Sequence, residues 1–310
     1  MNHPPRKLIP DEQTIVVLDT SPVRNLAYAD ATPGWVATFA DMANDSYSFS
    51  LADGACAELL TQHASGRLTD DQLDRIVGAI ETFVNPNVPV LPGKTDLMEM
   101  IGESAEPGWS EFGLRDMSSQ IWTVLKTASA TPEKDRVGAD EELQEDRDEW
   151  IGAFAKFEAG LAEWLEEVPD GEEKHPLHEH EHPLLERQFR NLAAHSLVQQ
   201  PTLAERLDLQ LRYVWRQWVR SRKAKDGYNP ASPKKRNDGI DLDLYRYLML
   251  PAFVVAEDGG FHKRIADIKS PQLDWFWQPQ NLADAWARGE RPRPAWAAVA
   301  ADQTTSQHAG

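Results

Sequence analysis

A short apolar run near the start of the chain ends abruptly in an acid and two hydroxyl residues. The run covers residues 14–18, Thr-Ile-Val-Val-Leu, and Asp19, Thr20 and Ser21 follow it directly. β-Branched and aliphatic residues in a run of this length are typical of a buried strand. In open α/β sheets the carboxyl ends of the strands carry the chemistry, so Asp19 is the first residue for which we expect a function.

The order of the following segments predicts an α/β fold with a central, mainly parallel sheet flanked by helices. Helices are expected from Pro22, over 34–42, after Asp53 as N-cap, after the Thr69-Asp70-Asp71 cap, and over 238–250. Residues 46–50 alternate like a short strand, and 252–256 read as a second buried strand.

Turn residues at 85–87 and 91–93 end this first pattern, and no convincing strand follows between 95 and 201. We therefore divide the chain into four stretches. The first and third, residues 1–94 and 202–296, form the two parts of the α/β domain, and the third carries a long basic helix. Residues 95–201 are a helical acidic insertion, and residues 297–310 are a disordered tail.

Charge is distributed unevenly along a chain whose net charge is −18. Residues 133–186 hold 19 acids against 5 bases, a balance of −14, and residues 206–236 hold 10 bases against 2 acids, a balance of +8. The net charge argues against a general nucleic-acid coat protein, but a local basic strip can still bind phosphate. The residues expected to steer an RNA backbone are Arg220, Arg222, Lys223, Lys234, Lys235 and Arg236. Salt bridging of this strip to the acidic insertion is an equally good interpretation.

One cysteine, Cys56, excludes an intramolecular disulfide and a four-thiolate metal site, which fits a reducing cytoplasm. No window approaches eighteen apolar residues, so we expect neither a signal peptide nor a membrane-spanning helix. The expected location is cytoplasmic, with no membrane partner.

Acids occupy the ends of both buried strands and the starts of two helices. They are Asp19 and Asp258 on the strands, and Glu58, Asp238 and Asp241 on the helices. Positions 238 and 241 share a helical face, whereas Asp243 points away from Asp241. Carboxylates brought together repel one another unless a hard divalent cation holds them, and a ligand set of oxygen atoms alone suits magnesium or manganese. Such a site can activate water against a phosphodiester.

Three motifs in this order resemble PIN-domain nucleases. They are Leu18-Asp19-Thr20-Ser21 after the apolar strand, Ala57-Glu58-Leu59-Leu60 on a helix, and the stretch from Asn237 through Leu250-Pro251 to Glu257-Asp258. The resemblance covers roughly residues 14–62 and 235–265. It implies a parallel sheet flanked by helices and a Mg²⁺- or Mn²⁺-dependent endoribonuclease, often the toxin of a toxin–antitoxin pair.

By that family's pattern, Asp19, Glu58, Asp241 and Asp258 are catalytic, and Asp19, Asp238, Asp241 and Asp258 hold metal. The implied partners are an RNA substrate, an antitoxin or other protein, and a second copy of the chain. Two features depart from the pattern. Ala256 stands where the family often has Thr or Ser, and the insertion of about one hundred residues is not part of the usual compact domain.

Other interpretations remain open for the same residues. Asp19 and Asp258 could serve only as a helix cap and a turn acid. A haloacid-dehalogenase-like phosphatase also begins from an Asp at a strand end, but it needs a second Asp where this chain has Ser21. A catalytically inactive PIN-like scaffold could bind a protein partner through the insertion. The run of histidines at 175, 178, 180 and 182 is more typical of a solvated loop than of a metal site.

Overall fold

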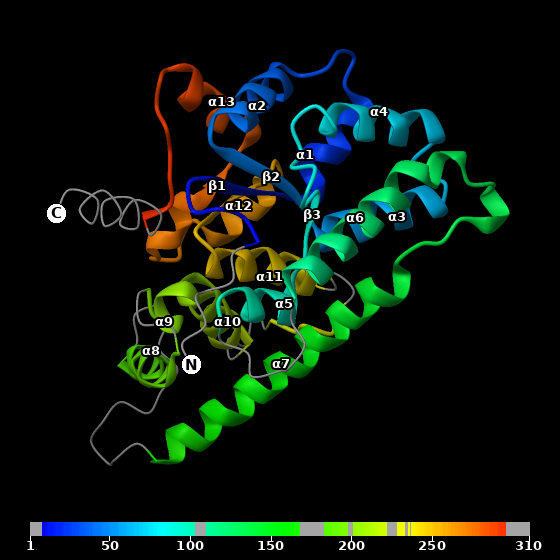
Figure 1. Ribbon diagram of the computed structural model, residues 1–310. Helices are drawn as coiled ribbons and strands as arrows, with labels where there is room; N and C mark the ends of the chain where they lie inside the picture. Colours follow the sequence, from blue (N-terminus) through cyan, green and yellow to red (C-terminus); the bar gives the residue numbers. More distant parts are fainter. Residues whose placement is uncertain are drawn as a thin grey trace.

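The computed structural model describes residues 8–102, 110–167, 183–197, 201–221, 228–232, 235 and 237–295. Its centre is a five-stranded sheet in the order β3-β2-β1-β4-β5, in which every neighbouring pair is parallel (Figure 1). The predicted α/β class is therefore confirmed. The histidine run and the tail at 297–310 lie outside the described residues.

The strand that opens the sequence, β1 (Thr14–Leu18), lies in the middle of this sheet. It pairs with β2 (Tyr47–Ala52) on one side and with β4 (Ala252–Val255) on the other. All residues of these three strands are buried, as expected when helices cover both faces of a parallel sheet. The alternation seen at 46–50 therefore does not mark an exposed face, and Ser50 instead donates a hydrogen bond to the carbonyl of Val88.

Two outer strands were not predicted. β3 (Val90–Leu91) pairs with the end of β2, and β5 (Phe276–Trp277) pairs with the end of β4. Each contains two residues, which is too short to produce a periodic pattern.

The N-terminal helices follow the predicted order with shifted ends. α1 (Thr20–Asn25) begins two residues before Pro22, and α2 (Gly34–Asp45) continues past residue 42. α3 (Asp53–Ala64) has Ala52, not Asp53, as its N-cap. α4 (Asp70–Ile80) has the capping box that Thr69 forms with Gln72, which confirms the predicted cap.

Aromatic packing fixes α2 on one face of the sheet. The Phe39 ring stacks on Phe49 of β2 with centroids 4.7 Å apart, and Phe83 meets both rings edge-on. The last helix, α13 (Pro279–Ala287), packs beside α2, and both lie above the sheet in Figure 1.

The described part of the predicted insertion contains the α-helices α5 (Lys94–Met100), α6 (Glu111–Thr127), α7 (Asp140–Glu167) and α8 (Pro183–His195). They share the main hydrophobic core through side chains such as Leu97, Leu125, Trp150 and Leu185. The long helix α7 runs along α3 and α11 below the sheet (Figure 1). Nothing in this arrangement tests the predicted domain boundaries, which remain predictions.

The C-terminal part differs from the sequence prediction in two helices. The basic helix is divided into α9 (Leu203–Arg206) and α10 (Asp208–Ser221). The helix expected over 238–250 ends earlier, as α11 (Asp238–Arg246), and a 3-10 turn, η4 (Tyr247–Met249), replaces its last turn. A short helix, α12 (Gly259–Ile265), follows β4, and the 3-10 helix η5 (Pro271–Trp275) leads into β5. Among the described residues, no helix is long and apolar enough to cross a membrane.

Candidate functional site

Asp19 emerges from the end of β1 and caps α1. Its Oδ2 accepts hydrogen bonds from the backbone N–H of Ser21 at 3.2 Å and from the Ser21 hydroxyl at 2.6 Å. The capping interpretation of Asp19 is thus correct, and it does not exclude a further role. The cap fixes the carboxylate at the carboxyl edge of the sheet.

Ser21 also connects this edge to the end of β4. Its hydroxyl group accepts a hydrogen bond from the backbone N–H of Glu257 at 2.9 Å and donates one to the Asp19 carboxylate. The next residue, Asp258, is the N-cap of α12 and accepts from the Gly260 N–H at 2.7 Å. One serine therefore fixes the relative position of the two strand ends that carry Asp19 and Asp258.

The other predicted acids reach the same edge from helices. Glu58 lies in α3, which follows β2, while Asp238 and Asp241 lie in the first turn of α11. The predicted orientation of Asp243 is confirmed, because it forms an ion pair with Arg246 at 3.0 Å instead of joining the other acids.

Electrostatic repulsion shows that the structure brings the predicted acids together. Asp19 repels Asp258 and Glu58, and Asp241 is repelled by Asp19, Asp238 and Glu58. We call these five residues, Asp19, Glu58, Asp238, Asp241 and Asp258, the acid cluster. They come from elements that span positions 19 to 258 of the sequence.

Burial and mutual repulsion both favour the protonated acids. Loss of solvation is the main cause that raises the pKa of Asp19, Glu58 and Asp241. The pKa of Asp241 reaches about 7 even though the nearby Arg264 lowers it. Hydrogen bonds from Ser21 and Thr20 partly offset the shifts at Asp19 and Glu58. The groups around the cluster therefore do not fully stabilise its negative charge when all of its acids are ionised.

Three arginines surround the acid cluster. Arg264 of α12 contacts Asp241 Oδ2 at 2.7 Å and lies 3.8 Å from Asp258 Oδ2. Arg24 of α1 and Arg147 of α7 both lower the pKa of Glu58 through their charge. Sequence reasoning named none of them, because nothing in a linear pattern shows which basic residues face a distant acid.

Asp238 is the most deeply buried member of the cluster. Its side chain is only 3 % exposed, and its Oδ2 has no hydrogen-bond partner among the described residues. The Tyr228 hydroxyl accepts a hydrogen bond from the Trp150 indole of α7 at 2.9 Å and donates its own proton to Asp238. Burial is the main cause that raises the pKa of Tyr228. A buried carboxylate oxygen without a partner is costly unless another group binds it.

The acid cluster offers the oxygen ligands that a hard divalent cation prefers, but its acidic groups are not spaced to hold one. Its ligands are oxygen atoms, and Asp238 has an oxygen free of partners in the described part of the chain. Within that part, however, no three acids, histidines or cysteines lie close enough to hold a metal ion.

The predicted RNA-binding residues are only partly described. Arg222, Lys223, Lys234 and Arg236 lie outside the described residues. Arg220 donates to Gln217 Oε1 at 3.0 Å, and both Arg220 and Lys235 lie 6.0 Å from the centre of the Tyr228 ring. Tyr228 in turn contacts Asp238, so this end of the basic strip lies next to the acid cluster.

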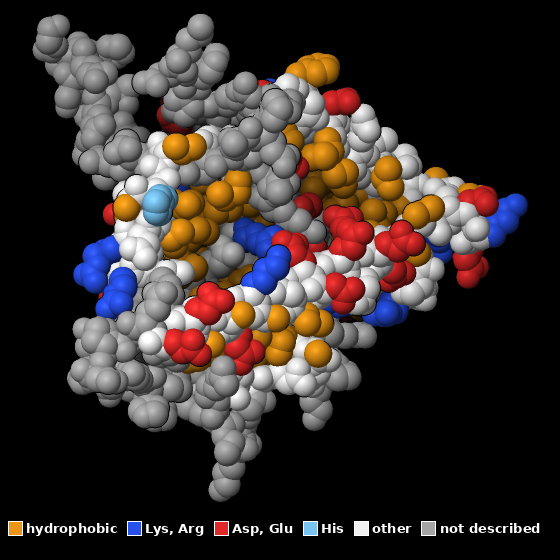
Figure 2. Space-filling model, turned by 90° about the horizontal axis from the view of Figure 1, so that it is seen from below, with side chains coloured by type: hydrophobic (Ala, Val, Ile, Leu, Met, Phe, Trp, Pro, Cys, Tyr) orange, Lys and Arg blue, Asp and Glu red, His pale blue; other side chains and the backbone are white. Residues whose placement is uncertain are grey.

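Arginines further along α10 form salt bridges. Arg212 pairs with Asp208 at 3.0 Å and with Glu186 of the insertion at 3.2 Å, while Arg216 pairs with Asp267 at 2.9 Å. Most acids of α7 instead face solvent, and they form a row of negative side chains on the lower face of the molecule (Figure 2).

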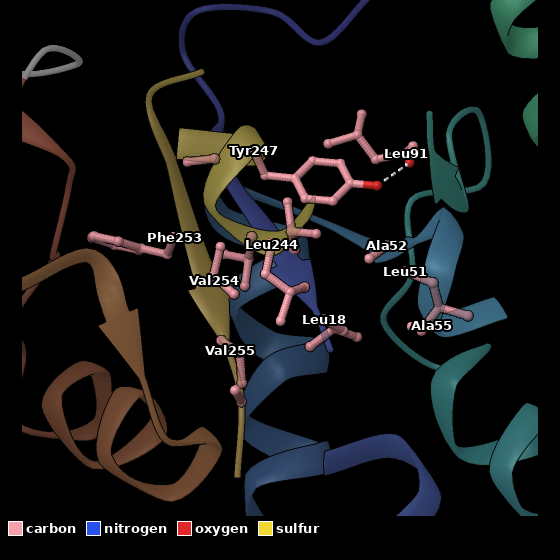
Figure 3. Close-up of a cluster of buried hydrophobic side chains, with 14 of the residues drawn as sticks. Leu18, Leu51, Ala52, Ala55, Leu91, Leu244, Tyr247, Phe253, Val254 and Val255 are labelled. Atoms are coloured by element: carbon pink, nitrogen blue, oxygen red, sulfur yellow. Dashed lines mark hydrogen bonds between the residues drawn. The ribbon is translucent and has the colours of Figure 1, made fainter. Parts of the chain in front are cut away.

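A further acid at a strand end was interpreted in the sequence only as a helix cap. Asp53 follows β2 directly, and its carboxylate accepts from the backbone N–H groups of Gly54 at 2.7 Å and Gly93 at 2.9 Å. The Tyr247 hydroxyl lies 2.7 Å from Asp53 Oδ1 and 3.0 Å from the carbonyl of Leu91, and Figure 3 shows the bond to Leu91 as a dashed line. Asp53 therefore joins β2, the chain after β3, and η4. The rule that identified Asp19, an acid directly after a buried strand, would also have identified Asp53.

No family model, curated protein or solved structure matches this chain.

Proposed function

We propose that the chain is a cytoplasmic, Mg²⁺- or Mn²⁺-dependent endoribonuclease of PIN type that hydrolyses RNA phosphodiester bonds. In this proposal Asp19, Glu58, Asp241 and Asp258 bind the metal, and Asp238 supports them. The proposal extends to a role as the toxin of a toxin–antitoxin pair, which would add an antitoxin as a protein partner.

The observation that carries this proposal is the meeting of five acids at the carboxyl edge of a parallel sheet. Asp19 and Asp258 follow β1 and β4 and cap α1 and α12, while Glu58, Asp238 and Asp241 lie in α3 and α11. Acids gathered solely for stability would be paired, because unpaired buried charges destabilise the fold. Here burial and repulsion raise the pKa of three of them, which is typical of functional sites.

A divalent ion at such a site lowers the pKa of a water molecule and neutralises charge on the phosphodiester. The chain's own residues would position the acids and attract the RNA. Ser21 holds the Asp19 carboxylate in place, and Thr20 does the same for Glu58. Arg220 and Lys235, which lie beside Tyr228, would attract the RNA backbone toward Asp238.

Asp19→Asn tests this site directly. The variant keeps an acceptor oxygen for capping α1 but loses the charge, so we expect Mn²⁺-dependent cleavage of a single-stranded RNA to fall by a factor of about 10² or more. The control is Asp45→Asn, because Asp45 is an exposed acid that forms an ion pair with Arg291 on the surface. Thermal unfolding of both variants shows whether the fold is retained. Cleavage that persists in a folded Asp19→Asn protein would reject the site.

One observation favours a second candidate, a PIN-like scaffold that binds a protein partner and no metal. Arg264 already pairs with Asp241 and Asp258, and the described acids are not spaced for a metal. The row of acids on α7 would then offer a surface for a basic partner. Titration with Mn²⁺ separates the two candidates, because a scaffold leaves all of the added Mn²⁺ free.

A further inference from the structure

We infer that Arg24 and Arg147 bind the phosphate backbone of RNA beside the acid cluster, so that helix α7 of the insertion forms one wall of the substrate site. The inference rests on the proposed function, because it takes RNA as the substrate. It assigns binding to two arginines on α1 and α7 that do not belong to the basic strip at residues 206–236.

Helix α7 packs against the two helices that carry most of the acid cluster. Leu143 of α7 lies in a small buried cluster with Ala57 of α3 and Ile240 of α11, and an acid of the acid cluster directly follows each of the last two residues. Residues four positions apart share one face of a helix, so Arg147 lies on the face of α7 that Leu143 turns toward α3 and α11. The insertion thus places a guanidinium group next to the acid cluster.

Helix α1 places the second arginine in the same way. The Thr20 side chain at the start of α1 forms a hydrogen bond with Glu58 of α3. Arg24 is four residues after Thr20 and shares its helical face, so both side chains point toward α3. Arg24 and Arg147 therefore approach Glu58 from two different helices, both of which pack on α3.

Neither arginine has an acidic partner within the described residues. Both side chains are half-buried, and the Nε atom of Arg147 is buried without a hydrogen-bond partner in that part of the chain. Both act on Glu58 through charge alone, and the pKa of Glu58 stays raised despite them. Arg264 differs, because it contacts Asp241 at 2.7 Å. A half-buried guanidinium group that lacks an ion pair can bind an anion without first breaking one.

A phosphodiester is the anion that suits this position. Guanidinium groups form paired, charge-assisted hydrogen bonds with phosphate oxygens. The carboxylates of the acid cluster repel a phosphodiester, so a substrate that approaches them needs positive charge nearby. Arg24 and Arg147 supply this charge beside Glu58, where the basic strip does not reach a described contact.

The test measures RNA binding in EDTA, so that it depends neither on a metal ion nor on cleavage. A fluorescein-labelled oligouridylate of about ten nucleotides is titrated with the full chain, and its fluorescence anisotropy is followed at several salt concentrations. The proteins are wild type, Arg24→Gln, Arg147→Gln, Arg147→Lys and the matched control Arg288→Gln. Arg288 pairs with Glu290, and its side chain is 61 % exposed. Thermal unfolding confirms that each variant is folded.

We expect each of the Arg24→Gln and Arg147→Gln substitutions to weaken binding about tenfold or more, because each removes a charge-assisted contact. Each should also reduce the slope of log Kd against log salt concentration by about 0.7, the value for one phosphate contact with a single strand. Arg147→Lys should keep the slope, and Arg288→Gln should change neither quantity. Unchanged binding by either folded glutamine variant, an equal loss in Arg288→Gln, or no binding by wild type would overturn the inference.

Cleavage of the same RNA after addition of Mn²⁺ tests the proposed function separately. Binding that depends on Arg24 and Arg147 without any cleavage would reject the nuclease proposal and leave the RNA site standing. Cleavage by wild type, together with unchanged binding by the two glutamine variants, would do the reverse.

Discussion

Gly239 lies between two members of the acid cluster, at the closest approach of α11 to α7. A β-carbon added there would lie 2.8 Å from the backbone oxygen of Asp146 and 2.9 Å from Cβ of Trp150. Ordinary contacts of this kind are about 3.5–4.0 Å. Neither group can move alone, because one is helix backbone and the other carries a buried indole ring. Gly239→Ala should therefore push α11 away from α7.

The magnitude follows from two opposing effects. Overpacking of a rigid core costs about 1–3 kcal/mol, whereas alanine is more favourable than glycine in a helix by about 0.5–1 kcal/mol. Gly78 separates the two effects, because it lies within α4 and a β-carbon there would meet no atom within 4 Å. We expect Gly78→Ala to stabilise the protein by about 0.5–1 kcal/mol, and Gly239→Ala to be less stable than Gly78→Ala by about 1–3 kcal/mol.

Urea unfolding followed by tryptophan fluorescence measures both free energies, with the same slope expected for each variant. The difference between the two variants isolates the overpacking, because the helical preference is common to both. Equal stabilisation by the two alanines would refute the close packing of α11 on α7.

Two further predictions concern Tyr247 and Asp241. Tyr247→Phe should cost about 1–3 kcal/mol in urea unfolding, because the buried oxygens of Asp53 and Leu91 share the single proton of this hydroxyl and would lose it. Tyr28→Phe, at a residue that is 58 % exposed, should cost nothing measurable. Folding raises the pKa of Asp241 from 3.8 to about 7, so the native state binds the proton more tightly and stability should fall as pH rises between these values. In Asp241→Asn this fall should be smaller, and an unchanged pH profile of the melting temperature would contradict the assignment.

Local patterns in the sequence predicted the parts of the fold that depend on near neighbours. The apolar run at 14–18 identified the central strand, and Thr69 with Gln72 identified the start of a helix. The face shared by Asp238 and Asp241, with Asp243 directed elsewhere, followed from helical geometry alone. The acids at the ends of two buried strands suggested a shared edge, because parallel strands end on the same side, but the sequence alone could not show that the helical acids meet them there.

Contacts between distant segments could not be predicted in this way. Arg264 is six residues after Asp258, but its pairing with Asp241 depends on how α12 turns back toward α11. No pattern in the sequence showed that the Trp150 indole would donate to Tyr228 beside Asp238. Pairing with neighbouring strands, and not local preference, creates the two-residue strands β3 and β5.

The position of β1 between β2 and β4 has a consequence for the order in which the chain can fold during synthesis. β2 follows β1 closely, but β4 begins at Ala252, so one edge of β1 has no partner until more than two hundred further residues have been made. Such non-local pairing slows folding and leaves a strand edge open to other chains. The hydrogen bond from the Glu257 N–H to the Ser21 hydroxyl also joins residues that are more than two hundred positions apart. The complete acid cluster therefore assembles only after the ribosome has passed Asp258.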